Sequence, residues 1–410
     1  MSELSYMEKL LDGVEVEWKL LEEVGKFQRG KRFVKKDMIS EGFPCIHYGE
    51  MYTHYDIWAN TSKSFVDKDL ASKLRVAECG DVVIVAAGET IEDIGRGTAW
   101  LGESSVVIHD ACFSYKSPLN PKYVSYFLRT KMFQDQIKPY ISSGKISAIN
   151  AKGLGKAKIP IPPLNVQAEI VRILDTFTEL TAELTAELTA RQQQYAYYRD
   201  ELLTFEEGEV EWKELSELTL STSNIKWSDT DSVYRYIDLS SVSRENNKIT
   251  ETTEITAENA PSRAKKLVEK DDVIFATTRP TQQRICLIDD EYSGGVVSTG
   301  YCVLRANPSA VIPKWIYFYL SSSNFKTYLE DVQSGSAYPA VSDAKVKSFK
   351  IPIPPISEQK RIVSILDKFD ALTTSLTEGL PREIELRQQQ YEYYRDLLLS
   401  FPKPEVASHD

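Results

Sequence analysis

The sequence predicts a mixed α/β protein made of two related halves, in each of which an α/β body is followed by a long helical arm. Two nearly identical repeats predict this organisation. The run IPIPPLNVQAEIVRILDTF, which starts at Ile159, returns at Ile351 as IPIPPISEQKRIVSILDKF. Its continuation RQQQYAYYRDELLTF, which starts at Arg191, returns at Arg387 as RQQQYEYYRDLLLSF. The chain is therefore expected to carry a pseudo-two-fold internal repeat.

A shorter match marks the start of the repeated unit. Residues 16–19 (VEWK) return as residues 210–213, shortly after the first arm. Together the matches divide the chain into four segments. These are a first body over residues 1–160, a first arm over 161–208, a second body over 209–352, and a second arm with the C-terminal tail over 353–410.

The two bodies resemble each other more weakly, but in register. Residues 78–82 (ECGDV) match 269–273 (EKDDV), and residues 123–128 (YVSYFL) match 315–320 (WIYFYL). Related folds with different surfaces are expected of two modules that do the same kind of job on different targets. Short β-rich stretches among turns and a few helices predict a mixed α/β body. The clearest stretches are residues 81–86, 273–276 and 296–304.

The arms have the apolar spacing of long amphipathic helices. In the first arm, apolar residues keep three-to-four spacing after a start punctuated by prolines. A helix over residues 166–205 would be about 60 Å long at about 1.5 Å per residue, which is typical of a coiled coil. We therefore expect the two arms to pair as antiparallel helices. The apolar positions are Ile170, Ile173, Leu174, Phe177, Leu180, Leu184 and Leu188.

The second arm carries a signal for a break. Residues 378–381 read EGLP, so that a glycine is closely followed by a proline. Glycine commonly ends a helix, and proline is pre-set for a first helical turn. We expect one helix to end at Gly379 and another to begin at Pro381, with a kink between them.

A tyrosine cluster recurs near the end of each arm. Because these residues lie in the repeated helical segments, we expect them to pack a helix–helix interface, with a binding role as the alternative. The cluster consists of Tyr195, Tyr197 and Tyr198 in the first arm and of Tyr391, Tyr393 and Tyr394 in the second.

The composition indicates an ordinary globular protein. Of 410 residues, 42% are hydrophobic and 27% charged, and the mean hydropathy is −0.32. No apolar run approaches the roughly 18 residues needed to span a bilayer. The five cysteines are odd in number and scattered, and residues 1–9 lack a basic segment leading into an apolar one. We therefore expect no membrane association and a location in a reducing cytoplasm.

The net charge of −11 is distributed unevenly. Most of the acidic excess lies in the arms, so a basic face on either body is compatible with the acidic sum. Residues 26–36 carry basic side chains and no acid, a density suited to phosphate contacts, with a solvated loop as the alternative. The basic residues of this strip are Lys26, Arg29, Lys31, Arg32, Lys35 and Lys36.

The second body has two basic stretches of the same kind, residues 263–266 (RAKK) and 278–284 (TRPTQQR). Arginine and glutamine can bind guanine and adenine edges with two hydrogen bonds. Ordinary surface side chains without a ligand are the alternative. The further candidate contacts are Arg263, Lys265, Lys266, Arg279 and Arg284, together with Arg96 in the first body.

Catalytic motifs are absent from the sequence. Residues 25–31 fit GxxxxGK, but Arg32 follows where a nucleotide-binding loop has the serine or threonine that binds magnesium. There is no CxxC, HExxH, GxSxG or GxGxxG pattern. Among the four histidines, His47 and His54 are near neighbours but lack evident partners for a metal, while His109 and His409 lie far away. We expect no enzyme active site and no metal site.

The arms resemble those of the specificity subunit of type I restriction-modification enzymes. The resemblance rests on Pro-Pro-(Leu/Ile) leading into residues 169–175 (EIVRILD) or 359–367 (QKRIVSILD), and on RQQQYxYYRD in both arms. The tandem TAEL at residues 181–188 resembles the repeat of one subgroup of that family. The resemblance covers the whole architecture.

This resemblance implies a non-catalytic DNA-recognition subunit. Each body would be a target-recognition domain for one half of a bipartite, asymmetric site in double-stranded DNA, with the arms as spacer. Two methyltransferase subunits, which use S-adenosylmethionine to methylate adenine, would dock on the arms, and motor-nuclease restriction subunits would join with ATP and Mg. This subunit would itself bind no cofactor. The basic residues named above are then the candidate DNA contacts.

Two other interpretations are open from the sequence. A coiled-coil adaptor, whose α/β bodies bind protein or carbohydrate ligands and not DNA, is compatible with near-neutral bodies. An enzyme built around residues 25–32 is disfavoured by the missing serine or threonine. Duplex binding with a steep salt dependence would separate a DNA reader from an adaptor, because a DNA reader releases counterions as it binds.

Overall fold

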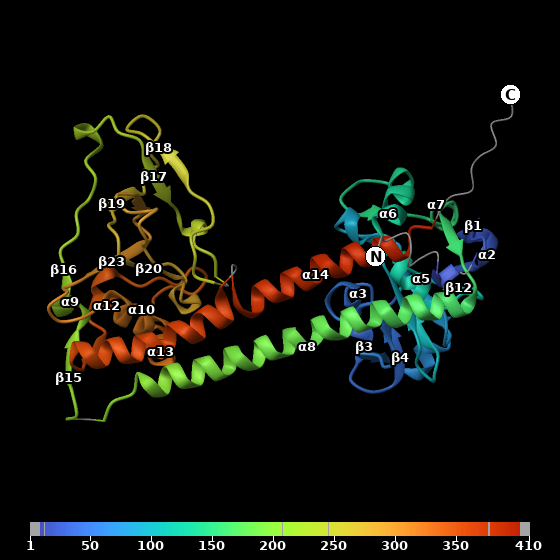
Figure 1. The fold of residues 1–410 in the computed structure, drawn as a ribbon, viewed down its shortest axis with the longest axis horizontal. Coiled ribbons are helices and arrows are strands. Elements are labelled where there is room, and N and C mark those ends of the chain that lie inside the picture. Colours follow the sequence, from blue (N-terminus) through green and yellow to red (C-terminus); the bar gives the residue numbers. More distant parts are fainter. Residues whose placement is uncertain (1–8, 12, 207, 245, 376–377, 402–410) are drawn as a thin grey trace. The chain divides into compact units, whose positions relative to one another are not determined.

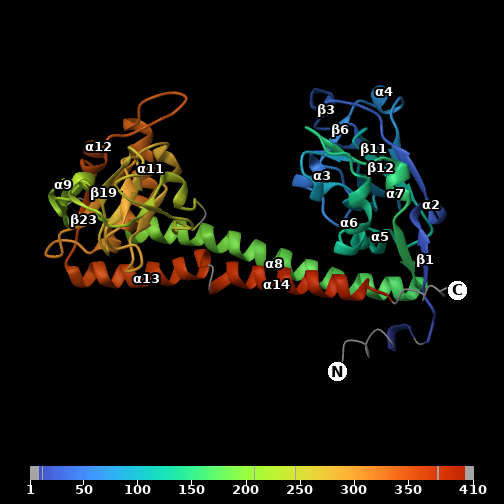
Figure 2. The same ribbon diagram turned by 90° about the horizontal axis from the view of Figure 1, so that it is seen from above.

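The computed structural model describes residues 9–11, 13–206, 208–244, 246–375 and 378–401. The first eight residues and His409, which entered the sequence expectations, lie outside the described residues. The chain divides into two compact units, one of Met1–Ala182 with Leu386–Asp410 and one of Glu183–Glu385. Figures 1 and 2 show the elements of each unit. No helix among the described residues has the length and apolarity to cross a membrane.

The first unit is built on two five-stranded sheets, with the strand orders β2-β12-β8-β10-β5 and β3-β6-β4-β11-β7, and the pairs β1-β14 and β13-β9. Short helices surround them. The strands are β1 (Glu17–Leu20), β2 (Lys26–Arg29), β3 (Met38–Ile39), β4 (Phe43–Ile46), β5 (Trp58–Ala59), β6 (Ser64–Val66), β7 (Val76–Ala77), β8 (Val82–Val85), β9 (Ala87–Gly88), β10 (Gly97–Trp100), β11 (Val106–Ile108), β12 (Cys112–Lys116), β13 (Ser147–Ala148) and β14 (Lys158–Ile161). The helices are α2 (Leu21–Val24), η1 (Lys35–Asp37), α3 (Glu50–Thr53), α4 (Lys68–Ala71), η2 (Ile91–Asp93), α5 (Pro121–Phe127), α6 (Lys131–Ile137), η3 (Lys138–Tyr140) and α7 (Ala151–Gly155).

Burial explains why β8 is central in its sheet. All four of its residues are buried, so both faces of the strand are covered, as its continuous apolar sequence predicts. The strand expected over residues 81–86 is thereby confirmed as β8. Around it lie fully buried aromatic side chains, which make up much of the core of this unit. They include Trp100, Tyr115, Tyr123, Phe127 and Phe133.

The second unit has two four-stranded sheets, with the orders β16-β23-β20-β21 and β18-β17-β22-β19, and the pair β15-β24. The strands are β15 (Glu211–Glu214), β16 (Thr219–Leu220), β17 (Tyr234–Ile237), β18 (Thr253–Ile255), β19 (Ala264–Leu267), β20 (Val273–Ala276), β21 (Ile285–Leu287), β22 (Val296–Ser298), β23 (Tyr301–Ala306) and β24 (Lys350–Ile353). The helices are α9 (Leu215–Leu218), η4 (Trp227–Asp229), η5 (Leu239–Ser241), η6 (Pro280–Gln282), α10 (Pro313–Ser321), α11 (Ser323–Val332), α12 (Asp343–Lys347) and α13 (Ile356–Thr374).

One predicted stretch of the second unit divides in the structure. Residues 273–276 form β20 as expected, but residues 296–304 contribute to two strands, β22 and β23, which belong to different sheets. The chain turns at Thr299 and Gly300 between them. A Cβ at Gly300 would lie 2.8 Å from Leu239 Cδ1, so glycine lets the turn pack closely against this leucine side chain. An apolar run does not reveal such a turn.

The internal repeat is visible in the backbone of both bodies. Strand β1 pairs with β14, and β15 pairs with β24, in the same antiparallel register. The turns at 78–82 and 269–273 have the same hydrogen bond, from the amide of Glu78 to Asp81 Oδ2 at 2.9 Å and from that of Glu269 to Asp272 Oδ2 at 2.8 Å. Helices α5 and α10 both begin with a proline. The weak sequence match between the bodies therefore reflects a shared fold.

The first arm is one continuous helix, α8 (Leu164–Leu202), which confirms the long helix expected over residues 166–205 (Figure 1). The second arm is α13 followed by α14 (Gly379–Leu398). The break was predicted, but its position was wrong, because Gly379 and Pro381 both lie in the first turn of α14 and α13 already ends at Thr374. Gly379 has φ +79°, and a Cβ there would lie 2.6 Å from Ala371 O, so the glycine allows α14 to start close against α13.

Within each unit, the arm helices pack through the repeated aromatic residues. In the first unit the beginning of α8 lies beside the end of α14, where Phe177 stacks on Tyr394 with ring centroids 5.4 Å apart. In the second unit the later part of α8 lies beside α13, where Tyr198 and Tyr195 stack on Phe369 at 6.0 and 6.3 Å. The predicted interface role is confirmed for these tyrosines. Tyr197 and Tyr393 are instead exposed, at 64% and 51%.

Candidate nucleic-acid interface

The near match to a nucleotide-binding loop is a β-strand in the structure. Residues Lys26–Arg29 form β2, which pairs with β12 along its whole length, so their backbone amides are not arranged as a phosphate cradle. A Cβ at Gly30 would lie 2.2 Å from His109 O, so this glycine serves close packing of the chain. Residues 25–30 are therefore a paired strand and a closely packed turn.

The basic strip of the first body is exposed but not a freely solvated loop. Its six basic side chains all belong to exposed residues. Two of them are tied to neighbouring backbone, since Arg29 Nε donates to Asp110 O at 2.8 Å and Lys31 Nζ donates to Lys73 O at 2.8 Å. The strip thus follows an edge strand and the turn η1, which hold its charges on a defined surface.

Part of this strip lines a cleft with an aromatic wall. Three rings from separate parts of the chain meet there, with the centroid of His109 4.6 Å from that of His47 and 5.1 Å from that of Tyr48. The expected proximity of His47 to His54 does not extend to contact, because His54 packs on Tyr55 instead, at 4.8 Å. The cleft is lined by Arg29, Arg32, Phe33, Lys35, His47, Tyr48, His109 and Ile146, among others. Of these rings Phe33, His47 and His109 are buried, and Tyr48 is exposed at 36%. Cations beside an exposed ring suit phosphates and a stacked base.

The two imidazoles of the cleft are held in one tautomer. His47 Nδ1 accepts from the amide of Gly49 at 3.3 Å, and His109 Nδ1 accepts from the amide of Ala111 at 3.1 Å. In the neutral form each ring therefore carries its proton on Nε2. Burial lowers the pKa of both rings, and the nearby charge of His109 lowers the pKa of His47 further. Although Asp110 Oδ1 lies 3.1 Å from His109 Nδ1, this contact is an ion pair only when the ring is protonated.

Sequence reasoning missed this histidine pair. His47 follows β4 and His109 follows β11, and these two strands pair in parallel. Their ends therefore lie side by side at the same edge of the sheet, although the residues are far apart in the sequence. The strand pairing that joins them was not predictable from periodicity, since each strand is short.

Other sequence candidates make internal contacts. Arg96 is paired with Asp93, with 2.8 Å between Nη1 and Oδ1. In the second body, Lys266 Nζ donates to Tyr301 O at 2.6 Å and to Asp343 Oδ2 at 2.5 Å. Arg284, which is half-buried, donates to a backbone carbonyl. By contrast, Arg263 and Lys265 are exposed on and before β19.

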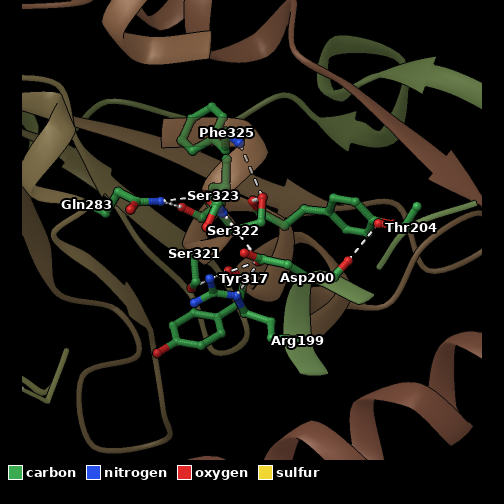
Figure 3. Close-up of polar contacts among 11 residues, drawn as sticks. Arg199, Asp200, Thr204, Gln283, Tyr317, Ser321, Ser322, Ser323 and Phe325 are labelled. Carbon is green, nitrogen blue, oxygen red and sulfur yellow. Dashed lines mark hydrogen bonds and ion pairs between the residues drawn. The ribbon is translucent and has the colours of Figure 1, made fainter. Parts of the chain in front are cut away.

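Arg279 is the exposed candidate with the most distinctive geometry. Its backbone has φ +50°, and its amide donates to Pro339 O at 2.7 Å. Its guanidinium lies over the ring of Tyr338, 5.5 Å from the centroid. Both features hold the arginine beside an exposed aromatic ring. The side-chain amide of the neighbouring Gln283 is engaged within the protein, because its Nε2 donates to two backbone carbonyls where α10 ends, as Figure 3 shows.

The second body is fixed to the end of α8 by a polar joint (Figure 3). Arg199 lies over the ring of Tyr195 and donates to Asp200 Oδ1 from Nε at 2.9 Å. The same carboxylate oxygen accepts from the amide of Ser323 at 3.3 Å. Thr204 Oγ1 donates to the carbonyl of Asp200 at 2.7 Å. The bond from Ser323 ties the helix end to the start of α11, and the other two orient Asp200 within the helix end.

A buried glutamine fixes each arm to its body in the same way. Gln167 and Gln359 are 1% and 0% exposed. The side-chain oxygen of each accepts a backbone N–H of the body, from Asn120 at 2.9 Å and from Ile312 at 3.0 Å. The Nε2 of each donates to the first carbonyl of the Pro-Pro pair before the helix, at 2.8 and 2.9 Å. The repeated sequence contains these glutamines, but their role was not predicted.

An equivalent ion pair is found in each unit, in addition to the contacts of Gln167 and Gln359, which we call the glutamine clamps. Lys122 Nζ lies 2.8 Å from Asp175 Oδ2 in the first unit, and Lys314 Nζ lies 2.7 Å from Asp367 Oδ2 in the second. The lysines lie in the first turns of α5 and α10, and the aspartates lie on the arm helices α8 and α13. Each body is thus attached to its arm by matching polar contacts, which makes body and arm segment one structural unit.

Two repeated α/β bodies, each attached to a helical arm, define the architecture of the chain, and comparison with known proteins gives its family. Residues 13–191 and 207–386 both match the family described as type I restriction modification DNA specificity domain. The chain is 36% identical, over 100% of both proteins, to the type I restriction enzyme EcoR124I/EcoR124II specificity subunit of Escherichia coli. It is 30% identical to the EcoprrI specificity subunit of Escherichia coli, over 92% of this chain and 93% of that protein.

A solved structure shares the fold. The crystal structure of a type I restriction-modification system S subunit from M. genitalium matches with a TM-score of 0.51, covering 96% of this chain and 98% of that one at 14% identity. The chain belongs to the family of type I restriction-modification specificity subunits. Its part in such a system is DNA sequence specificity, not catalysis. The adaptor and enzyme interpretations are therefore not favoured.

Proposed function

We propose that this chain recognises a bipartite, asymmetric site in double-stranded DNA and directs methyltransferase and motor-nuclease subunits to it. The observation that carries the proposal is the pair of equivalent bodies with different exposed surfaces. The first presents the exposed Arg32 and Tyr48 at a cleft, and the second presents Arg279 over Tyr338. Two related domains with different surfaces are suited to two different half-sites.

The arms are proposed to form the spacer between the two readers, as an antiparallel coiled coil with pseudo-two-fold symmetry. Support comes from the matching stacks of Phe177 on Tyr394 and of Phe369 on Tyr198, one in each unit. From its TAEL tract, we also assign the chain to the subgroup with that repeat. The corresponding segments are target-recognition domains over residues 1–160 and 209–352 and spacer arms over 161–208 and 353–410.

Symmetric arms suit two copies of one partner. Because both arms repeat the same contacts, two methyltransferase subunits can dock on equivalent surfaces of one chain. Restriction subunits then complete the complex. We assign no cofactor to this subunit and place S-adenosylmethionine, ATP and Mg in its partners. A cytoplasmic location stays a prediction.

The proposed DNA contacts are of two kinds, those with phosphates and those with base edges. The exposed basic side chains beside the first cleft and on β19 suit phosphates, which position the protein without specifying sequence. Arg279 suits a base edge. Arg96, Lys266 and Arg284 also make internal contacts, and we keep them as proposed DNA contacts of their bodies. The proposed phosphate contacts are Lys26, Arg29, Lys31, Arg32, Lys35, Lys36, Arg263 and Lys265.

The proposal is tested by mapping methylated adenines in DNA from cells that carry this subunit with its methyltransferase partner. We expect one motif of two different half-sites, separated by unread base pairs of fixed number. Cells that carry the methyltransferase alone are the control and should lack the motif. A continuous motif, or no motif in the presence of both subunits, would contradict the proposal.

A further inference from the structure

Each body presents a loop of the same length and frame between two of its helices, η3 and α7 in the first body and α11 and α12 in the second. In the first body, Ser142 and Ala148 exchange two backbone hydrogen bonds of 2.9 and 3.0 Å. In the second body, Ser334 and Ala340 exchange two of 2.9 Å. The two bridges enclose loops of equal length, so residues 142–148 correspond to 334–340 one by one.

The same frame is anchored to the same neighbours. The residue after the first bridge, Ile149, donates its amide to Ala86 O at 2.9 Å, beyond the end of β8. The residue after the second, Val341, donates to Thr277 O at 2.9 Å, beyond the end of β20. The next residue caps the following short helix, through Asn150 in the first body. Ser342 has that role in the second body. The two loops are therefore held by the same set of hydrogen bonds.

The tips of these matched loops differ, and each carries an exposed apolar side chain. Ile146 is 62% exposed, and its counterpart Tyr338 is 73% exposed. A single exposed apolar side chain on a protein surface needs no explanation. Two exposed apolar side chains at the same position of a duplicated loop do call for an explanation. The backbone hydrogen bonds of the loop are the same in both bodies, while the residue at the tip differs.

Each tip also lies beside the cations that its body offers to DNA. Ile146 lines the first cleft together with Arg29 and Arg32. Tyr338 lies under the guanidinium of Arg279, whose amide donates to the carbonyl of Pro339 in the same loop. A ligand that contacts these cations through phosphates or base edges would therefore meet the tips as well.

We propose that the loops 142–148 and 334–340 are matched reading loops, in which Ile146 and Tyr338 contact bases and determine specificity, each in its own half-site. This inference rests on the proposed function and names the element that performs it. Ile146 offers a phosphate neither a charge nor a hydrogen bond, so on a duplex its favourable contacts are with apolar surfaces such as the thymine methyl group. The ring of Tyr338 can pack on a base surface in the same way, and its hydroxyl can donate to a base edge or to a phosphate oxygen. A panel of substituted duplexes separates these two contacts, because a phosphate contact would weaken binding to all sequences alike. Variation at one tip residue changes the sequence read without disturbing the frame.

The test uses the full chain in complex with its methyltransferase partner and the single variants Ile146→Ala and Tyr338→Ala. Binding is measured to the mapped duplex and to a panel in which each base pair of either half-site is replaced. Each variant should lose about tenfold in affinity at one base pair of one half-site and none at the other half, the two variants affecting opposite halves. The slope of affinity against salt should stay unchanged, since no charge is removed.

Reciprocal and matched controls make the outcome decisive. For each variant, unchanged discrimination at the half-site read by the other body shows that the variant protein is folded. Val233→Ala removes a side chain that is 60% exposed in the second body and should leave the whole panel unchanged. Panels identical to the parent's for both tip variants, or equal losses on all sequences, would overturn the reading-loop proposal while leaving the bipartite function intact. A parent complex without any site preference would instead overturn the proposed function.

Discussion

Lys31 and Arg32 are the residues at which a phosphate role of the first body can be tested by charge alone. Both are exposed, and Lys31 is oriented by its hydrogen bond to Lys73 O. The double variant Lys31→Ala, Arg32→Ala should weaken binding to all duplexes alike and reduce the salt slope by about 1 for each phosphate that is no longer neutralised. Lys68→Ala, at another exposed lysine, is the control. Unchanged affinity and slope would leave the strip as surface charge that does not touch DNA.

Arg279 is predicted to read a base edge in the second half-site. Arg279→Ala should reduce the free energy of binding to the preferred site by about 1–3 kcal/mol and relax specificity in that half alone. Arg279→Lys keeps the charge but loses the planar fork that can bind a base with two hydrogen bonds, so it should restore little of the specificity. Competition binding with substituted duplexes measures both. An equal loss on scrambled DNA would assign Arg279 to the phosphate backbone.

His47 and His109 should make the stability of the chain depend on pH. Burial lowers the pKa of both below the usual 6.5, so the unfolded chain binds more protons as the pH falls through that value. The free energy of unfolding should therefore decrease as the pH is lowered from about 7.5 to about 5.5. In the double variant His47→Gln, His109→Gln this decrease in the free energy of unfolding should be smaller than in the parent. In the control His54→Gln, at an exposed position, it should equal that of the parent. Thermal melts at the two pH values decide it; equal decreases in all three proteins would reject the effect.

At the scale of the element, the glutamine clamp offers a direct test of how a body is fixed to its arm. Gln359→Ala removes the acceptor of the Ile312 amide and the donor to Pro354 O, and leaves these buried groups unpaired. The free energy of unfolding should fall by about 1–3 kcal/mol. Gln192→Ala, at an exposed position of α8, should change it by less than about 0.5 kcal/mol. Denaturant titration compares them, and similar small effects would mean that the clamp contributes little.

The same elements show what the sequence can reveal. The helix α8 and the strands β8 and β20 were predictable because a long period or a buried apolar run determines them locally. The division of residues 296–304 reflects the pairing of β22 and β23 with strands of two different sheets, which lie elsewhere in the chain. The start of α14 at Gly379 likewise depends on its approach to Ala371.

In the candidate interface, too, local features could be predicted from the sequence and contacts between distant residues could not. Its charges could be predicted, because density along the chain is a local property. The meeting of His47 with His109 could not be predicted, since it depends on the pairing of β4 with β11. The internal partners of Lys266 and Arg284 could not be predicted either, since they lie in elements far away along the chain. The matched loops had only a faint sequence signal, because their tips differ and the hydrogen bonds that match are made by the backbone.

At the scale of the whole molecule, the TAEL tract is predicted to set the distance between the half-sites. The tract lies inside the continuous helix α8. Each added four-residue unit lengthens a helix by about 6 Å and turns it about 40° past a full turn. One base pair turns DNA by about 35° and rises about 3.4 Å. Because each target-recognition domain must face the groove, the rotation added by one TAEL unit should determine how many base pairs the spacer gains. The difference between about 6 Å of helix and about 3.4 Å of DNA can be absorbed by helix tilt or DNA bending.

Methylation mapping of a variant with one more TAEL inserted after Leu188 tests most directly whether two readers are separated by a helical spacer. We expect the unread spacer of the motif to lengthen by about one base pair, while both half-site sequences stay the same as in the parent. An unchanged spacer, or altered bases in either half-site, would contradict a helical spacer between two independent readers.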